Sequence, residues 1–389
     1  MAAAAHLWQA DPTLQVSVID PAGQWLSTWY RQFEMAEIEW LRSPVVHHPA
    51  PDPFALERFM RNHDLPRSGQ RYELPLTEVF AKFCRALIAH MNLANPIAAR
   101  PTSIRSDGEA VIVELPDQSL RAGHLIVATN SHRRPRPAWV DPLLGQHPGL
   151  ITHGLDIDLP ALPALDGVCV AIVGGGITAG HLAVGAAARG AAVHLISRET
   201  LRIRDFDTDP GWLGPRFLDA FNDEPDPSRR LSTAQEARNG GSVPDWMHTQ
   251  LSTYDGPGSI RLHEASVVRQ AAVRGDARCV LQLSDGSVLN ADRLWLATGT
   301  QADVATLRCL RPLLDDVVTQ NGVPLVGDDL RLGPHPAFVM GRLAMAALGP
   351  AAGNLWGAQR AARRITDAIA GVDLTARDKQ EAALHLKPR

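Results

Sequence analysis

Residues 168–196 contain the clearest succession of apolar elements in the chain. Residues 168–173 form a short, mostly β-branched run, which is typical of a strand buried in a parallel sheet. A glycine-rich segment follows, then an alanine-rich stretch with helical spacing, and then a second apolar strand at 192–196. The uncharged stretch 168–188 is long enough for a membrane span. Its three consecutive glycines, and its change from strand-like to helix-like spacing, favour a βα unit instead.

The glycine-rich segment, residues 174–180, matches the pattern G-x-G-x-x-[GA] between a strand and a helix. Gly174 permits a tight turn, and Gly176 lets the backbone approach a pyrophosphate. Ala179 or Gly180 lets the helix pack closely on the sheet, and the first helical amides offer N–H groups to phosphates. We therefore predict a dinucleotide site, with a ligand-free glycine turn as the alternative. The predicted contacts are Gly174, Gly176, Ile177, Thr178 and Ala179.

The second strand ends in Ser197 and Arg198, where a site for NADH usually carries Asp or Glu. A hydroxyl followed by a guanidinium suits the 2′-phosphate of NADPH. Arg202 and Arg204 follow closely and are placed to assist. The sequence therefore predicts NADPH, with a merely solvated Arg198 as the alternative.

Two distant segments, 113–130 and 281–299, resemble each other. Each predicts a strand, an Asp-centred turn, a second strand, and a buried apolar strand that ends in Ala-Thr. A repeat at this long interval indicates two duplicated domains.

The repeat extends towards the N-terminus, where residues 15–20 correspond to 192–197. Residues 1–7 then fall on the start of the helix that follows the glycine turn. The counterpart of 168–177 would precede Met1. We therefore expect the sequence as given to begin inside a first dinucleotide-binding unit, without its first strand and glycine loop. A degenerate unit that no longer binds its nucleotide is the alternative.

The composition fits a globular protein of two domains, with 389 residues, 45% of them hydrophobic and 21% charged. A net charge of −4 gives no reason to expect a nucleic-acid partner. The four cysteines form no CxxC pair, which disfavours a disulfide framework, a zinc site and a redox dithiol. Motifs of hydrolases and NTPases are absent, and the N-terminal residues do not resemble a signal peptide. We expect a cytoplasmic protein with no membrane partner and no metal site.

Two Rossmann units, each closed by a meander that ends in an Ala-Thr-Gly-like segment, resemble the two-dinucleotide-binding flavoprotein superfamily. Within it, the chain looks most like flavin-dependent monooxygenases, including the lysine and ornithine N-hydroxylases. The resemblance implies an α/β fold with an NADPH domain, residues 161–306, inserted into a discontinuous FAD domain, residues 1–160 and 307–389. It also implies FAD and NADPH as cofactors.

The resemblance carries FAD contacts over to the N-terminal unit. Asp20 ends the second strand of this unit and would hold the adenosine ribose. Gln24 and Trp25 follow Gly23, as in the glycine-then-tryptophan segment that lies near the flavin in flavin monooxygenases.

The two crossing segments between the domains are also implied to contact cofactor, through Thr129 in the first, and through Thr298 and Gly299 in the second. Asn130 stands where the first segment would carry glycine. Asn tolerates a left-handed backbone better than most residues.

Near the C-terminus, the resemblance places Gly341 beside the FAD ribityl chain and the start of a helix, residues 356–370, at the flavin pyrimidine. A helix N-terminus favours the negative charge of the reduced ring. Asn354 and Leu355 precede this helix, and Arg342 stands where many relatives have Asp. The alternative for the helix is an amphipathic surface helix.

His47 and His48 lie in a proline-bounded loop after an aromatic-rich stretch. They are candidate substrate or flavin contacts, because a histidine titrates near neutral pH. A structural role is the alternative, and a metal site lacks a third ligand at a suitable spacing. Residues 205–212 predict a polar loop between domains, and 223–241 predict a mobile insertion or lid.

The resemblance implies that NADPH reduces FAD by hydride transfer. In a monooxygenase, a C4a-hydroperoxyflavin then hydroxylates a small amine, an amino acid or another soft nucleophile. Because the cofactor carries the chemistry, no catalytic side chain is predicted. The alternatives are a flavin-dependent reductase or dehydrogenase with another acceptor, and a non-enzymatic NADP(H)-binding protein. The sequence reveals neither the small-molecule substrate nor the oligomeric state.

Overall fold

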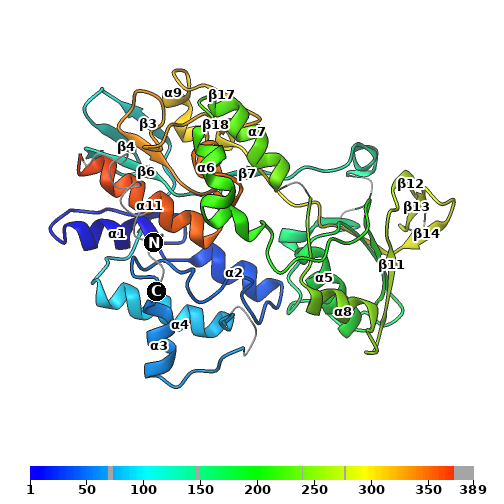
Figure 1. Cartoon of the computed structure of the whole chain (residues 1–389). Coiled ribbons are helices and arrows are strands. Elements are labelled where there is room, and N and C mark those ends of the chain that lie inside the picture. Colours follow the sequence, from blue (N-terminus) through cyan, green and yellow to red (C-terminus); the bar gives the residue numbers. More distant parts are fainter. Residues whose placement is uncertain (69–72, 146, 148, 239, 276, 372–389) are drawn as a thin grey trace.

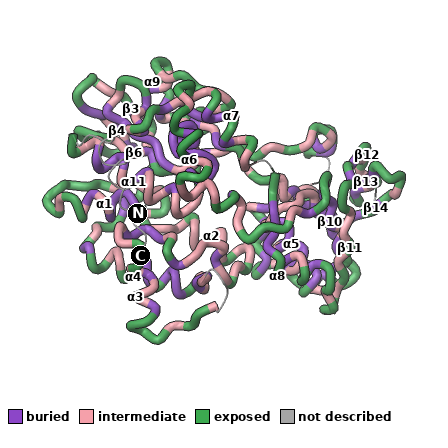
Figure 2. Tube along the Cα trace, viewed as in Figure 1, coloured by how far each residue is buried: buried purple, intermediate pink, exposed green. Residues whose placement is uncertain are grey.

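The computed structural model describes residues 1–68, 73–145, 147, 149–238, 240–275 and 277–371. Figure 1 shows a larger lobe, which contains both the first and the last described helices, and a smaller lobe built from the middle of the chain. Figure 2 shows buried segments inside both lobes and exposed segments on their outer loops. None of the helices in these residues has the length and apolar character that a membrane crossing requires.

The smaller lobe is built on a five-stranded sheet in the order β11-β10-β9-β15-β8, and every neighbouring pair is parallel. The central strand β9 is almost wholly apolar because both faces of the sheet are covered. Val170, Ala171 and Ile172 in this strand are fully buried. The strands are β8 Ile151–His153, β9 Cys169–Val173, β10 Ala192–Ile196, β11 Ser259–His263 and β15 Arg293–Leu296.

Helices cover one face of this sheet, and an antiparallel meander covers the other. The helices are α5 Ile177–Ala188 and α8 Asp245–Ser252, which share one apolar cluster with β9 and β10. The meander contributes Cys279, Leu281 and Leu289 to a second cluster on the opposite face. Its strands are β12 Val268–Val273, β13 Cys279–Leu283 and β14 Val288–Ala291.

The larger lobe repeats this arrangement in part, which confirms the predicted duplication. Its meander, β3-β4-β5, is antiparallel like β12-β13-β14. A short strand, β6, then follows, as β15 follows the second meander. The strands are β3 Ser103–Ser106, β4 Val111–Glu114, β5 Ser119–Ala122 and β6 Leu125–Val127.

The parallel strands of the larger lobe form two separate pairs. Strand β1 Ile19–Asp20 pairs with β2 Ile97–Ala98, and β19 Ala337–Val339 pairs with β6. In the smaller lobe β9 joins the two halves of the sheet, whereas no strand in the described residues joins β1 to β6. The strand predicted over 15–20 is wrong in length, because residues 15–17 are exposed and only Ile19 and Asp20 pair.

Helices α1 Ala2–Ala10 and α11 Leu355–Ile369 pack along each other in the larger lobe (Figure 1). The small side chains of residues 2–5 are buried, which lets the two backbones approach closely. The predicted C-terminal helix is confirmed to within one residue at each end. Its Ala361, Ala362 and Ile365 are fully buried, so the surface-helix alternative is wrong.

Three helices form a separate cluster in the larger lobe, with Leu56, Met60 and Phe80 at its centre. The segment 36–54 connects the first two of these helices and packs beside them. The helices are α2 Ser27–Met35, α3 Ala55–Asn62 and α4 Thr77–His90.

Two helices leave the smaller lobe and pack on the larger one. They are α6 Pro215–Asp223 and α7 Pro227–Ala237, and α7 packs against α10 Met345–Leu348. Leu231 is fully buried in the core of the larger lobe. The predicted mobile insertion or lid over 223–241 is therefore wrong for residues 227–237, which form a packed helix that Asp226 caps through a 2.9 Å bond from the Ser228 amide.

The remaining elements are short. Strand β8 joins the smaller sheet although it precedes residue 161, the expected start of the NADPH domain. The short strands are β7 His132–Arg133, β16 Gln301–Ala302, β17 Thr319–Gln320 and β18 Val323–Pro324, and the short α-helix is α9 Arg311–Leu314. The 3-10 helices are η1 Ala138–Leu143, η2 Gly154–Asp156, η3 Pro210–Leu213, η4 Val304–Thr306, η5 Arg308–Leu310, η6 Gly341–Ala344 and η7 Pro350–Gly353.

Candidate functional site

The glycine turn lies at the carboxyl end of β9, where α/β folds place their ligands. The Gly174 amide donates to the Ile196 carbonyl at 2.9 Å, which continues the β9–β10 ladder into the turn. A Cβ atom on Gly174 would lie 2.3 Å from the carbonyl oxygen of Ala297, at the end of β15. Only glycine fits here, because the turn is pressed against the backbone of the neighbouring strand.

Helix α5 begins directly after this turn, with Gly176 as its N-cap. No side chain caps the first amides, so those of Ile177 and Thr178 are available to a ligand or to water. The first turn contains no acidic residue, and its partial positive charge suits a phosphate. Ala179 is fully buried between the helix and the sheet. The predicted contacts therefore lie together and fit the pyrophosphate of a dinucleotide.

A segment that was not predicted as part of the site lies against this turn. A Cβ atom on Gly241 would lie 2.6 Å from the Cα atom of Gly176, so the two glycine backbones touch. Beside it, Gly240 has a φ of +78° and faces the guanidinium group of Arg202. The pair of consecutive glycines was the only sequence signal for this contact.

Ser197 and Arg198 follow β10 beside the glycine turn. The Ser197 side chain is 5% exposed, and its hydroxyl donates to the carbonyl of Glu199 at 2.6 Å. The Arg198 side chain is 71% exposed, 4.0 Å from the Glu199 carboxylate. Arg202 pairs with the same carboxylate at 2.5 Å. Of these residues, Arg198 presents the most accessible guanidinium group to a phosphate.

The two crossing segments between the lobes lie side by side, because β7 and β16 pair in an antiparallel ribbon. Thr298 donates to the carbonyl of Pro135 at 2.6 Å, and Gly299 has a φ of +73°. Asn130 does not adopt a left-handed backbone, so the expectation that it replaces a glycine for this reason is wrong. Its side-chain oxygen instead accepts a bond from a distant arginine. Thr129 is exposed.

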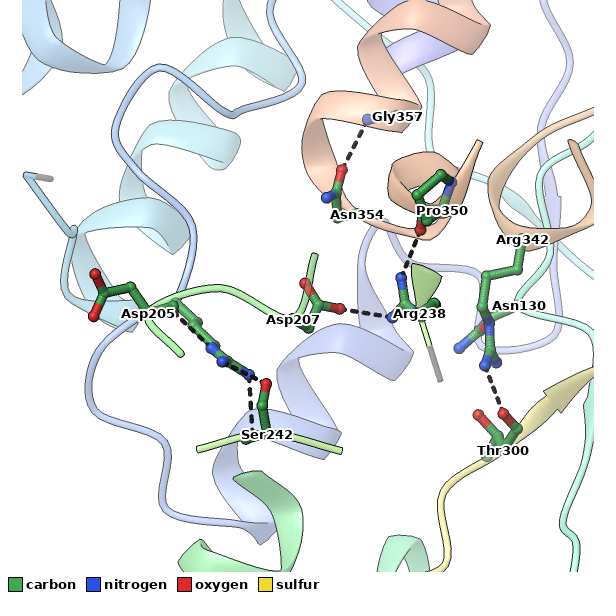
Figure 3. A network of polar contacts seen from close by, with 11 residues as sticks. Asn130, Asp205, Asp207, Arg238, Ser242, Thr300, Arg342, Pro350, Asn354 and Gly357 are labelled. Atoms are coloured by element: carbon green, nitrogen blue, oxygen red, sulfur yellow. Dashed lines mark hydrogen bonds and ion pairs between the residues drawn. The ribbon is translucent and has the colours of Figure 1, made fainter. Parts of the chain in front are cut away.

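That arginine is Arg342, which joins both crossing segments. It donates to the carbonyl of Thr300 at 2.9 Å and to the Asn130 side chain at 3.1 Å (Figure 3). A Cβ atom on Gly353 would lie 2.4 Å from the Cγ atom of Arg342, so the glycine makes room for this side chain. Burial, followed by repulsion from Arg238, lowers the pKa of Arg342 to about 10. The guanidinium group therefore remains charged at neutral pH.

Gly341 and the start of α11 are the elements predicted to lie at the flavin. Gly341 has a φ of +64°, and a Cβ atom there would meet no atom within 4 Å. The Asn354 side chain accepts a 2.9 Å bond from the Gly357 amide and caps α11, with Leu355 as the first helical residue (Figure 3). The open space beside Gly341 therefore leaves room for a ligand there. Among the described residues, the first unit has no counterpart of the β9 glycine turn for the FAD pyrophosphate.

The side chains predicted at the N-terminal part of the FAD site are engaged in local contacts. Asp20 accepts bonds from the Ala22 amide at 2.8 Å and from the Ser27 hydroxyl at 3.3 Å. The Trp25 indole donates to the carbonyl of Ala94 at 3.0 Å. Gln24 is exposed.

His47 and His48 differ in their surroundings. The His48 side chain is 0% exposed, and burial lowers its pKa to about 4. Its Nδ1 accepts from the Ala50 amide at 3.2 Å, and its Nε2 lies 3.1 Å from the carbonyl of Pro53. Both ring nitrogens are thus used by the backbone, which supports the structural alternative for His48. His47 is half-buried, and burial lowers its pKa.

The buried His48 predicts a loss of stability in mild acid. The ring is neutral in the folded protein down to about pH 4, whereas it protonates near 6.5 in the unfolded chain. The stability that the neutral, buried ring contributes to the folded protein is therefore complete above pH 6.5 and is lost as the pH falls towards 4. His48→Asn keeps an acceptor for the Ala50 amide but has no ring to protonate. When the pH falls from 7 to 5, we expect its free energy of unfolding to fall by about 2 kcal/mol less than that of the wild type. Urea unfolding at the two pH values measures this difference, and equal losses in both proteins would contradict it.

Polar contacts hold the two lobes together beside the glycine turn. Arg238, which follows α7, donates to the Asp207 carboxylate at 2.7 Å and to the carbonyl of Pro350 at 3.0 Å (Figure 3). A second arginine, Arg42 of the larger lobe, bonds to Ser242 and to the carbonyl of Asp205. These contacts could not be predicted from the sequence, because the acceptors are mostly backbone carbonyls.

Comparisons with known proteins bear on the fold. No family model matches the chain, and no curated protein matches its sequence. Solved structures do match. The cadaverine monooxygenase of the desferrioxamine pathway of Erwinia amylovora, solved with FAD, has a TM-score of 0.71 at 16% identity, over 95% of this chain and 92% of that chain.

Two further structures match over almost their whole length. The ornithine N-hydroxylase of Kutzneria sp. 744 has a TM-score of 0.72 at 16% identity, over 95% of this chain and 96% of that chain. The L-lysine 6-monooxygenase of Pseudomonas syringae has a TM-score of 0.70 at 16% identity, over 95% of this chain and 97% of that chain. The chain therefore shares its α/β fold, with two domains of the dinucleotide-binding type, with these three enzymes.

Proposed function

We propose that this chain is an FAD- and NADPH-dependent oxidoreductase of the monooxygenase class, acting on a small amine or amino acid. The observation that carries the proposal is the glycine turn at the start of α5, in a lobe joined to a second lobe of related topology. A strand, a tight glycine turn and an uncapped helix start form a binding site for a dinucleotide pyrophosphate. A second lobe of related topology beside it suits a reaction between two dinucleotide cofactors.

The structural neighbours support the choice of cofactors and substrate class. The Erwinia enzyme was solved with FAD, and the Kutzneria enzyme with reduced FAD, NADP⁺ and L-ornithine. All three neighbours act on a diamine or a diamino acid. A primary amine on a short aliphatic chain is therefore the substrate to test first.

In this proposal, the nicotinamide dinucleotide lies on Gly174, Gly176 and the first turn of α5, with its 2′-phosphate at the accessible Arg198, next to Ser197. Gly341 and the start of α11 receive the flavin end of FAD. FAD, when bound, supplies the redox centre that takes a hydride from NADPH and passes electrons to an acceptor. The residues of the chain would hold the two cofactors close together at the junction between the lobes.

The thiols give no support to a dithiol mechanism. Burial raises the pKa of Cys84 to about 12 and that of Cys279 to about 11. A buried thiol that stays protonated is a poor nucleophile. Oxygen is therefore the proposed acceptor rather than a disulfide.

The test begins with the purified chain incubated with FAD and freed of excess cofactor. We expect it to retain a visible flavin spectrum that NADPH bleaches without oxygen. With oxygen, cadaverine, lysine and ornithine are added in turn, while NADPH oxidation, peroxide and hydroxylamine are measured. A hydroxylated amine, with less peroxide released, supports the monooxygenase. NADPH oxidation that depends on a quinone or another acceptor indicates a reductase, and the absence of flavin binding and of NADPH oxidation rejects both.

The accessible guanidinium group of Arg198 predicts the coenzyme preference. We expect Arg198→Ala to raise KM for NADPH by about tenfold, because a charge-assisted contact to the 2′-phosphate is lost. KM for NADH should change little, because NADH lacks that phosphate. Steady-state oxidation of both coenzymes measures the ratio. Equal changes in both KM values would assign Arg198 no role in selecting NADPH.

A further inference from the structure

Arg42 belongs to the larger lobe, and its backbone is firmly held there. The Leu41 side chain is buried in the cluster around α4, and the Leu41 amide donates to the carbonyl of Pro75 at 3.0 Å. Trp40 forms a bridge with Leu76, directly before α4. The start of the Arg42 side chain is therefore fixed relative to the larger lobe.

The guanidinium group of Arg42 reaches two chain segments of the other half of the molecule. Its Nε donates to the carbonyl of Asp205 at 2.8 Å, and its Nη2 to the carbonyl of Arg204 at 2.6 Å. On the second segment, Nη2 donates to the Ser242 hydroxyl at 2.9 Å and Nη1 to the Ser242 carbonyl at 3.3 Å. Figure 3 shows the ends of these bonds at Asp205 and at Ser242. A planar fork of donors can serve both segments at once.

These two segments are the chain passages between the smaller sheet and helices α6 and α7. The passages are themselves joined, because the Val243 amide donates to the carbonyl of Arg202 and the Arg204 amide donates to the carbonyl of Val243, both at 2.9 Å. Arg42 therefore fastens both passages to the larger lobe at one point.

The residue before Ser242 is Gly241, whose backbone touches Gly175 and Gly176 of the dinucleotide turn. Gly176 is the position where a dinucleotide approaches the backbone most closely. The line of contacts thus runs from Arg42 through Ser242 and Gly241 to the turn. Ser242 is buried, so this line is a packed part of the structure.

We propose that Arg42 is a positioning residue for the nicotinamide dinucleotide: by holding Ser242, it sets how closely Gly241 lies against the glycine turn, and hence the space left for the pyrophosphate. The inference rests on the proposed function and deepens it, because it links a residue of the larger lobe to the proposed coenzyme site of the smaller lobe. If Arg42 only joined the lobes, its loss would weaken the binding of all parts of the coenzyme to the same extent.

The test compares two ligands by calorimetric titration of the full chain. NADP⁺ spans the turn, whereas 2′-AMP reaches only the 2′-phosphate end and is measured as a competitor. Arg42→Met removes every donor and keeps the aliphatic part of the side chain, and Arg42→Lys keeps the charge without the fork. Gly241→Ala places a methyl group 2.6 Å from Gly176 and disturbs the same spacing from the other side. The matched control is Arg105→Met on β3, an exposed arginine that pairs with Glu114 at 3.0 Å.

We expect Arg42→Met and Gly241→Ala to weaken NADP⁺ binding by about tenfold and 2′-AMP binding by about twofold or less. Arg42→Lys should fall between Arg42→Met and the wild type, and Arg105→Met should match the wild type. Unchanged NADP⁺ affinity in Arg42→Met overturns the inference. Equal loss of both ligands, together with a lower melting temperature, assigns Arg42 a structural role and also overturns it. If the wild type binds neither NADP⁺ nor NADPH, the proposed function fails first, and the inference fails with it.

Discussion

Replacing Gly174 by alanine is expected to abolish NADP⁺ binding and to destabilise the smaller lobe. The new Cβ atom would lie 2.3 Å from the Ala297 oxygen and 2.9 Å from its carbonyl carbon. Neither atom can retreat easily, because β15 is paired on both sides, with β9 and with β8. Overpacking against fixed backbone costs about 3 kcal/mol, and it displaces the turn that receives the phosphates. Urea unfolding and calorimetric titration with NADP⁺ measure the two effects.

Gly180→Ala is the matched control for this prediction, because it adds the same methyl group on α5 nearby. There the nearest atoms belong to the side chain of Met247, at 2.8 Å, and methionine adapts readily. Alanine also gains about 1 kcal/mol over glycine in a helix. We expect this variant to keep its NADP⁺ affinity and most of its stability. If both variants behave alike, the close fit of Gly174 against β15 is not what keeps the site intact.

Gly341→Ala is expected to lower the flavin content of the purified protein by about tenfold or more, with only a small change in stability. Its φ of +64° makes alanine unfavourable by about 1 kcal/mol. Within the protein the new methyl group meets no atom within 4 Å. The larger loss would come from the cofactor, because the proposed site places the ribityl chain beside this residue. Flavin absorbance per protein and the melting temperature of the apoprotein separate the two effects.

Gly286→Ala provides the corresponding control in the turn between β13 and β14. Gly286 also has a positive φ, +85°, and also has nothing within 4 Å of a Cβ atom. It lies in the meander of the smaller lobe, away from the proposed flavin site. We expect a similar change in melting temperature and no change in flavin content. Equal flavin loss in the two variants would remove Gly341 from the flavin site.

The parts of the fold that follow local patterns could be predicted from the sequence. Strand β9, the glycine turn, helix α5 and strand β10 lie where the two apolar runs, the glycine-rich segment and the helical spacing predicted them. The two meanders were found because a strand, a turn and a strand leave the same pattern twice. Such elements are determined by neighbours in the chain, and those neighbours are visible in the sequence.

The contacts that complete the candidate site could not be predicted, because they join distant segments through the backbone. Arg42 bonds to residues 162 to 200 positions away, and most of its acceptors are carbonyl groups that every residue carries. The contact between Gly241 and Gly176 likewise depends on how α6 and α7 direct the chain back to the turn. The polar composition of 223–241 concealed an apolar face, which includes the buried Leu231 and Ala234. Long-range packing of this kind leaves no periodic signal.

Helices α6 and α7 also bear on how proteins of this architecture can recombine. By chain order they belong with the smaller lobe, but Leu218, Phe221 and Leu231 are buried in the core of the larger lobe. If residues 161–306 were exchanged between two such proteins, α6 and α7 would be exchanged with them. The α7 of the donor protein would then have to pack against the α10 of the recipient. A chimera that retains both helices of the recipient, with junctions near residues 204 and 243, would keep that core intact. The lobes can therefore be exchanged without disturbing this core only if residues 204–243, whose ends Arg42 contacts, stay with the larger lobe.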